Sequence, residues 1–72
     1  MSAANVAELS ENIEKIVRQF TRDPDGAWEI RNALTAEIAK NNIALAKEYV
    51  QYNLQKAPLA VKNDLNQINR LF

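Results

Sequence analysis

Apolar residues recur at alternating steps of three and four along the first part of the chain. The members of this series are Val6, Leu9, Ile13, Ile16 and Phe20. Such spacing places all of them on one face of an α-helix. Asn5 precedes the series and Glu8 follows three residues later, in the pattern of a capping box. The sequence therefore predicts a helix from about 5 to 21 with a single apolar face.

The segment RDPDG at 22–26 separates two predicted helices. Asp23 can cap the start of a helix, Pro24 fits the first helical position, and Asp25 complements the helix dipole. A type I turn followed by a helix that begins after Gly26 is the alternative. Because the break is short in either case, the helices on its two sides should form an antiparallel hairpin.

No residue that breaks helices occurs between this turn and Pro58. Asn41 and Asn42 are the weakest point, but asparagine is a mediocre helix former and no breaker. We therefore expect one long helix from about 24 to 55, which ends because the residue before a proline leaves helical geometry. A third helix is expected from about 58 to 71. The alternative is a bend at Asn41–Asn42 that lets the chain close as a small monomeric bundle.

The long predicted helix carries apolar residues on two separate faces. The first face holds Ala27, Ile30, Leu34, Ile38, Leu45, Tyr49 and Tyr52. The second face holds Trp28, Ala36, Ala39, Ile43, Ala46, Val50 and Leu54. A helix that is apolar over most of its circumference is buried over most of it. We therefore expect this helix to be the central element of the fold.

The second apolar face lacks a partner in the chain, because the first helix is about half as long as the central one and the third can cover only one stripe. Unpartnered apolar strips usually mark interaction surfaces. The predicted interface residues are Trp28, Ala39, Ile43, Ala46, Val50 and Leu54. The predicted core residues are Val6, Leu9, Ile13, Ile16, Phe20, Ile30, Leu34, Ile38, Leu65, Ile68 and Phe72.

Composition removes several kinds of chemistry. The chain has no Cys and no His, which excludes disulfides, thiolate metal sites and the commonest general base. The sequence holds no phosphate-binding loop, no metal-ligand cluster and no nucleophile beside a base, so we expect no enzyme, no cofactor and no bound metal. The longest apolar runs are four residues, such as IALA at 43–46, and predict no membrane span. No signal-peptide pattern opens the sequence, so we expect a cytoplasmic location, with leaderless export left open.

The charges balance overall but not locally. The formal net charge is zero, and no basic helix face is visible, so nucleic acid is not an expected partner. Residues 1–39 carry seven acids and four bases, a net of −3, and residues 40–72 carry five bases and two acids, a net of +3. An acidic half and a basic half can favour contacts between copies of the chain.

Three segments give the chain a plan that resembles the needle subunits of type III secretion systems. They are TRDPDG at 21–26, YVQY at 49–52 and VKNDLNQINRLF at 61–72. Such subunits are short, cysteine-poor helical hairpins with a proline-containing turn and an apolar C-terminus. The chain departs from them in having one proline in the turn where they have two, and in Pro58, which interrupts the C-terminal helix. The resemblance implies a filament subunit.

The sequence as a whole predicts a single all-α domain over residues 1–72: a helical hairpin with a long central helix and a short C-terminal helix, assembled into a helical oligomer. The function that fits is a small non-enzymatic interaction or structural protein. It would act through helix–helix contacts, either as a homo-oligomer or on another helical protein. A subunit of a helical filament or pilus-like assembly is the alternative, and a dimeric DNA-binding regulator is a weaker third.

Overall fold

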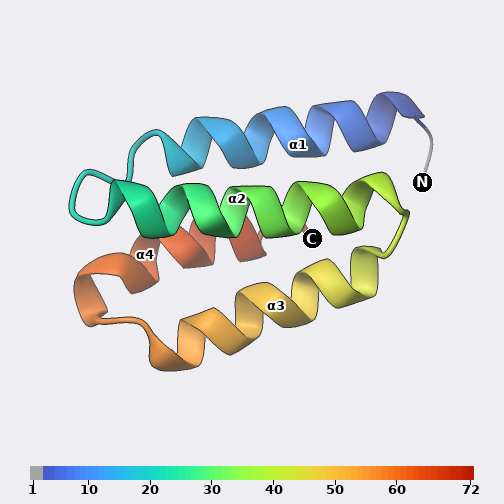
Figure 1. Ribbon diagram of the computed structural model, residues 1–72. Helices are drawn as coiled ribbons and strands as arrows, with labels where there is room; N and C mark the ends of the chain where they lie inside the picture. The colour runs from blue at the N-terminus through green and yellow to red at the C-terminus, as the bar shows by residue number, and fades with distance from the viewer. Residues whose placement is uncertain (1–2) are drawn as a thin grey trace.

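The computed structural model describes residues 3–72, which form four α-helices and no strand within that range (Figure 1). The helices are α1 (Ala3–Val17), α2 (Pro24–Ala39), α3 (Ile43–Lys56) and α4 (Leu59–Asn69). The prediction of an all-helical fold is confirmed. Helix α4 lies within the predicted third helix, with Pro58 as its N-cap and not its first residue.

The helices form a four-membered bundle in which each runs opposite to the one before it (Figure 1). Each helix packs on its neighbour in sequence, and α4 also packs on α1. Figure 1 shows α2 in front, between α1 and α3, with α4 behind it. The connections are short, as is typical of up-down-up-down bundles. The molecule measures 33 × 20 × 18 Å.

The first helix differs from its prediction at both ends. It begins at Ala3, so Asn5 lies inside α1 and does not cap it; the alanines that precede Asn5 are strong helix formers and let the helix continue toward the N-terminus. It ends at Val17, four residues before the predicted end at 21. Phe20 follows in the connection to α2 and is still buried.

The second helix begins as its capping signals predict. Asp23 is the N-cap of α2, and the Gly26 amide N–H donates to its Oδ1 at 3.1 Å. Pro24 occupies the first helical position, where its missing N–H is not needed. Asp23 therefore starts the helix, and the alternative start after Gly26 does not occur.

The single long helix expected from about 24 to 55 is wrong. The chain turns back at residues 40–42, so two helices of similar length, α2 and α3, replace it. Asn41 has a φ of 62°, in the left-handed region that asparagine tolerates better than most residues. A second helical hairpin, formed by α2 and α3, therefore replaces the expected long central helix.

Backbone hydrogen bonds show why α2 ends at this point. The Asn41 amide N–H donates to the Ile38 carbonyl at 2.9 Å, and the Asn42 amide N–H donates to the Glu37 carbonyl at 2.8 Å. This pair of bonds is the Schellman arrangement, which satisfies the last carbonyls of a helix when the residue after its C-cap is left-handed. The Asn42 side chain adds a bond to the Glu37 carboxylate at 3.0 Å. Asparagine thus acts here as a helix terminator.

Apolar residues from all four helices form the core. The buried residues are Leu9, Ile13, Val17, Phe20, Ala27, Leu34, Ile38, Ala46, Val50, Leu65 and Ile68. Seven of these belong to the predicted core set. The other four members of that set, Val6, Ile16, Ile30 and Phe72, are partly buried and pack against the cluster.

Candidate interaction groove

The turn at 40–42 decides which face of α3 is buried. Ala46 and Val50 have no exposed surface, because α3 presents them to the core. Ile43 and Leu54 are partly buried against the same cluster. Four of the six predicted interface residues therefore pack within the chain, and the prediction of an interface at Ala46 and Val50 is wrong. A left-handed residue between two helices ends the regular 100° progression on which that prediction rested.

The other two predicted interface residues, Ala39 and Trp28, are exposed and lie near opposite ends of α2. Ala39 is the last residue of α2 and lies at the surface beside the turn. Trp28 is 37% exposed and lies under two cations of its own chain: the Arg18 and Arg31 guanidinium carbons are 5.8 and 5.4 Å from the ring centre.

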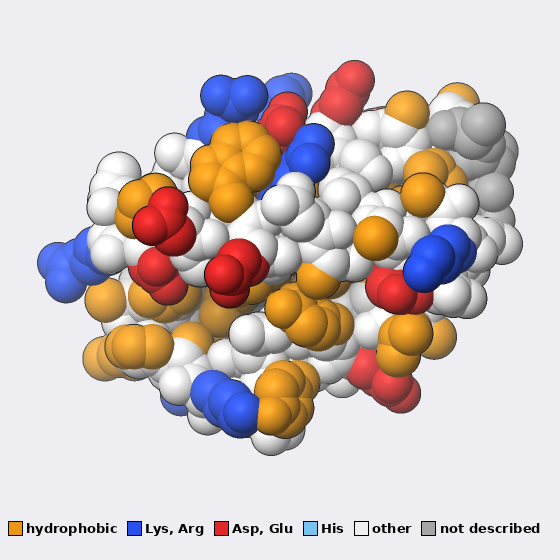
Figure 2. Space-filling view, viewed as in Figure 1, with side chains coloured by type: hydrophobic (Ala, Val, Ile, Leu, Met, Phe, Trp, Pro, Cys, Tyr) orange, Lys and Arg blue, Asp and Glu red, His pale blue; other side chains and the backbone are white. Residues whose placement is uncertain are grey.

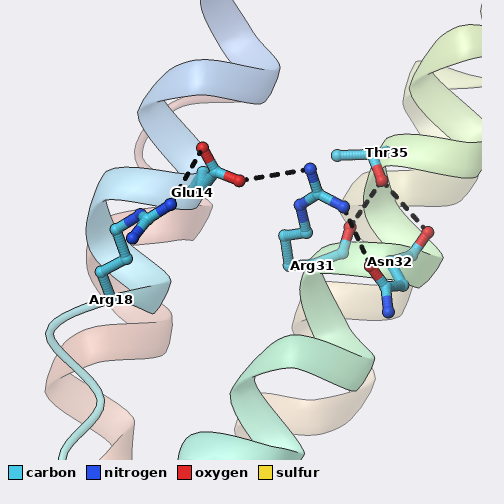
Figure 3. A network of polar contacts seen from close by, with 5 residues as sticks. All are labelled: Glu14, Arg18, Arg31, Asn32 and Thr35. Carbon is cyan, nitrogen blue, oxygen red and sulfur yellow. Dashed lines mark hydrogen bonds and ion pairs between the residues drawn. The ribbon is translucent and has the colours of Figure 1, made fainter.

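Polar contacts tie the Trp28 region to α1 (Figure 3). Arg31 of α2 donates to the Glu14 carboxylate of α1 at 3.3 Å, and Arg18 lies 3.9 Å from the same carboxylate. Figure 3 shows Glu14 between the two arginines, with the Thr35 hydroxyl donating to the Arg31 carbonyl at 2.9 Å. This network joins α1 to α2, so intramolecular packing accounts for Trp28 without a partner.

The large apolar side chains that remain exposed on α3 are ones that the sequence placed on the other face. Leu45, Tyr49 and Tyr52 are 50%, 37% and 55% exposed. They follow one another at steps of four and three, so they form one row on α3. This row is exposed because the neighbouring face of α3, about 100° round the helix, carries Ala46 and Val50 into the core.

The exposed row forms one wall of a groove between α2 and α3. The lining residues are Ala33, Ala36 and Glu37 from α2 and Leu45, Glu48, Tyr49 and Tyr52 from α3. The groove has a volume of about 620 Å³. Figure 2 shows hydrophobic side chains gathered along the line between these two helices. Ala33 and Ala36 of α2 contribute small side chains to the groove, and Tyr49 and Tyr52 of α3 contribute large ones.

Charges are placed unequally along the groove. Glu37 and Glu48 are the acidic residues of its lining, and Glu37 lies close to the α2–α3 turn. Glu37 is 3.9 Å from the Lys40 ammonium, whereas Glu48 forms no ion pair among residues 3–72. At the opposite end, the Lys56 ammonium lies 4.1 Å from the centre of the Tyr52 ring and donates to the Tyr52 hydroxyl. The groove lining is therefore acidic, and the base Lys56 follows beyond Tyr52 along α3.

A smaller hollow of about 440 Å³ lies near the start of α4, and Arg22, Asp23 and Lys56 contribute to its mixed lining. In the described chain, no three His, Cys, Asp or Glu residues converge on a point that could hold a metal ion. No helix among residues 3–72 has the length and apolar character that crossing a membrane requires.

Comparison with protein-family models, with characterised proteins and with solved structures finds no match to this chain.

Proposed function

We propose that this protein is a small non-enzymatic interaction protein that receives the apolar face of a helix in the groove between α2 and α3. The observation that carries the proposal is the exposure of Leu45, Tyr49 and Tyr52 as one contiguous row beside the groove. A chain of 72 residues has few large apolar side chains to bury, and contiguous exposed apolar patches mark binding surfaces.

The shape of the groove suits a helix better than an extended peptide. Its walls are two antiparallel helices, and a third helix would pack on them as the helices of the bundle pack on each other. Ala33 and Ala36 allow close approach of a helix backbone, and Tyr49 and Tyr52 belong to the residue type that dominates binding energy in many interfaces. An amphipathic helix offers matching apolar residues at steps of three and four.

The filament alternative has less support. A filament needs two different complementary surfaces on each subunit, and among residues 3–72 the large hydrophobic residues with comparable exposure outside the groove are Trp28 and Leu59. Trp28 already contacts Arg18 and Arg31, and Leu59 is an isolated residue at the start of α4. One apolar groove favours a contact with one partner helix, from another copy or from another helical protein.

Site-specific photo-crosslinking tests this proposal. Tyr52 is replaced by benzoylphenylalanine, which preserves the aromatic ring in the groove, and the matched control carries the same side chain at Leu59, which is 82% exposed and outside the groove. We expect adducts from position 52 that map to the apolar face of a helix, and loss of these adducts when Tyr49→Lys is added. Equal adducts from both positions, or adducts that survive Tyr49→Lys, would contradict a docking role for the groove.

A further inference from the structure

We infer that the helix that fills the groove is α3 of a second copy of this chain, and that the two copies pair about a two-fold axis with their α3 helices antiparallel. This inference rests on the proposed function of the groove and specifies its occupant. It follows from the order of side chains along α3, which is complementary to itself when one copy is turned end to end.

The row on α3 shows this self-complementarity directly. Leu45, Tyr49, Tyr52 and Lys56 follow at steps of four, three and four and so share one face. An axis that crosses α3 between Tyr49 and Tyr52 places each of these rings over the other ring of the second copy. The same axis places Lys56 beside Leu45 and Glu48 of the second copy. Glu48 is a carboxylate without an ion pair in its own described chain, and this pairing supplies one.

The α2 wall of the groove is compatible with this pairing because its side chains are small. Ala33 and Ala36 line the groove opposite the α3 row. Small residues allow the backbone of another helix to approach closely. The α3 helix of the second copy can therefore lie in the groove beside α3.

A different two-fold arrangement, in which α2 of one copy lies over α3 of the other, is disfavoured by charge. Glu37 and Glu48 both line the groove, so that arrangement would bring the carboxylates of the two copies together. Like charges in close opposition oppose association. Antiparallel pairing of the two α3 helices instead places each Glu48 near Lys56 of the other copy.

The size of the face predicts a dimer in equilibrium with the monomer. The face measures at most 33 × 20 Å, so pairing buries roughly 1,000 Å² over both copies, near the lower limit for specific interfaces. We therefore expect a mass that rises with concentration and levels off at two chains. An isologous contact uses the same surface on both copies, so it closes after one partner has bound.

Charge exchange between positions 48 and 56 tests the inference on the full chain. Glu48→Lys alone and Lys56→Glu alone each place like charges in opposition twice per pair, and we expect the dissociation constant to rise at least about tenfold. An equimolar mixture of these two variants restores opposite charges at both contacts, and so does the double variant Glu48→Lys/Lys56→Glu. Lys47→Glu, an equal charge change at an exposed residue outside the groove, is the matched control.

Sedimentation equilibrium over a wide concentration range provides the readout, with circular dichroism to verify that each variant is folded. Two chains for the wild type, weaker pairing for each single variant and recovery in the mixture support the inference. A wild-type protein of one chain at every concentration overturns it, as does a mixture that pairs no better than its components. If the wild type is a single chain while Tyr52 crosslinks to another helical protein, the second copy is wrong and the groove remains a docking site. If Tyr52 also gives no specific crosslink, both proposals fail.

Discussion

Helix α2 contacts α1 on one side and α3 on the other, and the two contacts are filled very differently. Toward α1 it presents Arg31, which pairs with Glu14 of α1 (Figure 3), and Trp28, which contacts Arg18 just after the end of α1. Toward α3 it presents Ala33 and Ala36, which leave a groove of about 620 Å³. The helices are antiparallel in both cases, so side-chain size along one helix, and not the topology, decides whether a surface is closed or open.

The comparison also separates two kinds of exposed aromatic residue. Trp28 and Tyr49 are both 37% exposed, but Trp28 is flanked by two guanidinium groups of its own chain. Tyr49 lines the groove beside other apolar side chains. Exposure alone therefore does not identify a binding residue. The side chains that surround the ring show whether it already has contacts within its own chain. The variants described next test that distinction, beginning with the largest expected effect.

A lysine on each face of α3 should have opposite consequences. Val50→Lys places a charge where the side chain has no exposed surface, and we expect a loss of about 4 kcal/mol or more and an unfolded chain at every concentration. Leu45→Lys changes a half-exposed residue, so the helical circular dichroism should persist while association is lost. If Leu45→Lys unfolds the chain and Val50→Lys does not, the assignment of Val50 to the buried face and Leu45 to the exposed face is wrong.

Truncation of one residue in the core and one in the groove sharpens the same contrast. Ile13 is fully buried, and Ile13→Ala should lower the free energy of unfolding by about 2–4 kcal/mol because it leaves a cavity. Tyr52→Ala removes a side chain that is 55% exposed and should lower it by less than about 1 kcal/mol. Urea unfolding at a concentration where the chain is dissociated measures both values. Equal losses would mean that the groove is part of the core.

Asn41 creates the groove by ending α2, so its backbone conformation can be tested separately. Asn41→Ala should lower the free energy of unfolding by about 1 kcal/mol, because alanine is less stable than asparagine at a φ of 62°. Asn41→Gly is the matched control, since glycine adopts this conformation without steric penalty. Thermal unfolding followed by circular dichroism compares the two. A stabilising effect of Asn41→Ala would indicate that a continuous helix competes with the turn.

The smallest effect is expected at the polar contact between α1 and α2. Glu14→Gln removes a carboxylate that faces Arg18 and Arg31 at a partly exposed site, and we expect a loss below about 1 kcal/mol that shrinks as salt is added. Glu11→Gln, at an exposed position on the same helix, is the control. Urea unfolding at low and high salt measures the difference, and a loss independent of salt would assign Glu14 a packing role.

Much of the first half of the molecule could be predicted from sequence. The series from Leu9 to Phe20 is on the buried side as its spacing predicts, and Asp23 and Pro24 begin α2 as their chemistry predicts. These features depend on interactions within a few residues of each other. Local steric and hydrogen-bonding preferences are sufficient to specify them.

The groove could not be predicted in this way, because its two walls come together only through the turn at 40–42. Ile38 and Ala46 are both fully buried, yet in a continuous helix residues eight apart would point roughly 80° away from each other. In the sequence, the apolar residues change from one helix face to another next to Asn41 and Asn42, and this shift was the signal that the helix could break there. A continuous helix and a turn at the asparagines have similar local energies, so the shift alone could not decide between them.

The sequence by itself determined that the chain is helical, where its first hairpin turns and which residues of α1 are apolar on one side. Only the tertiary structure decided that Ala46 and Val50 face inward while Leu45 and Tyr49 face outward. The physical reason is that asparagine can continue a helix or end it at small cost. Packing of α3 against α2 and α4, which buries Ala46 and Val50, gains free energy that no local preference of Asn41 can provide.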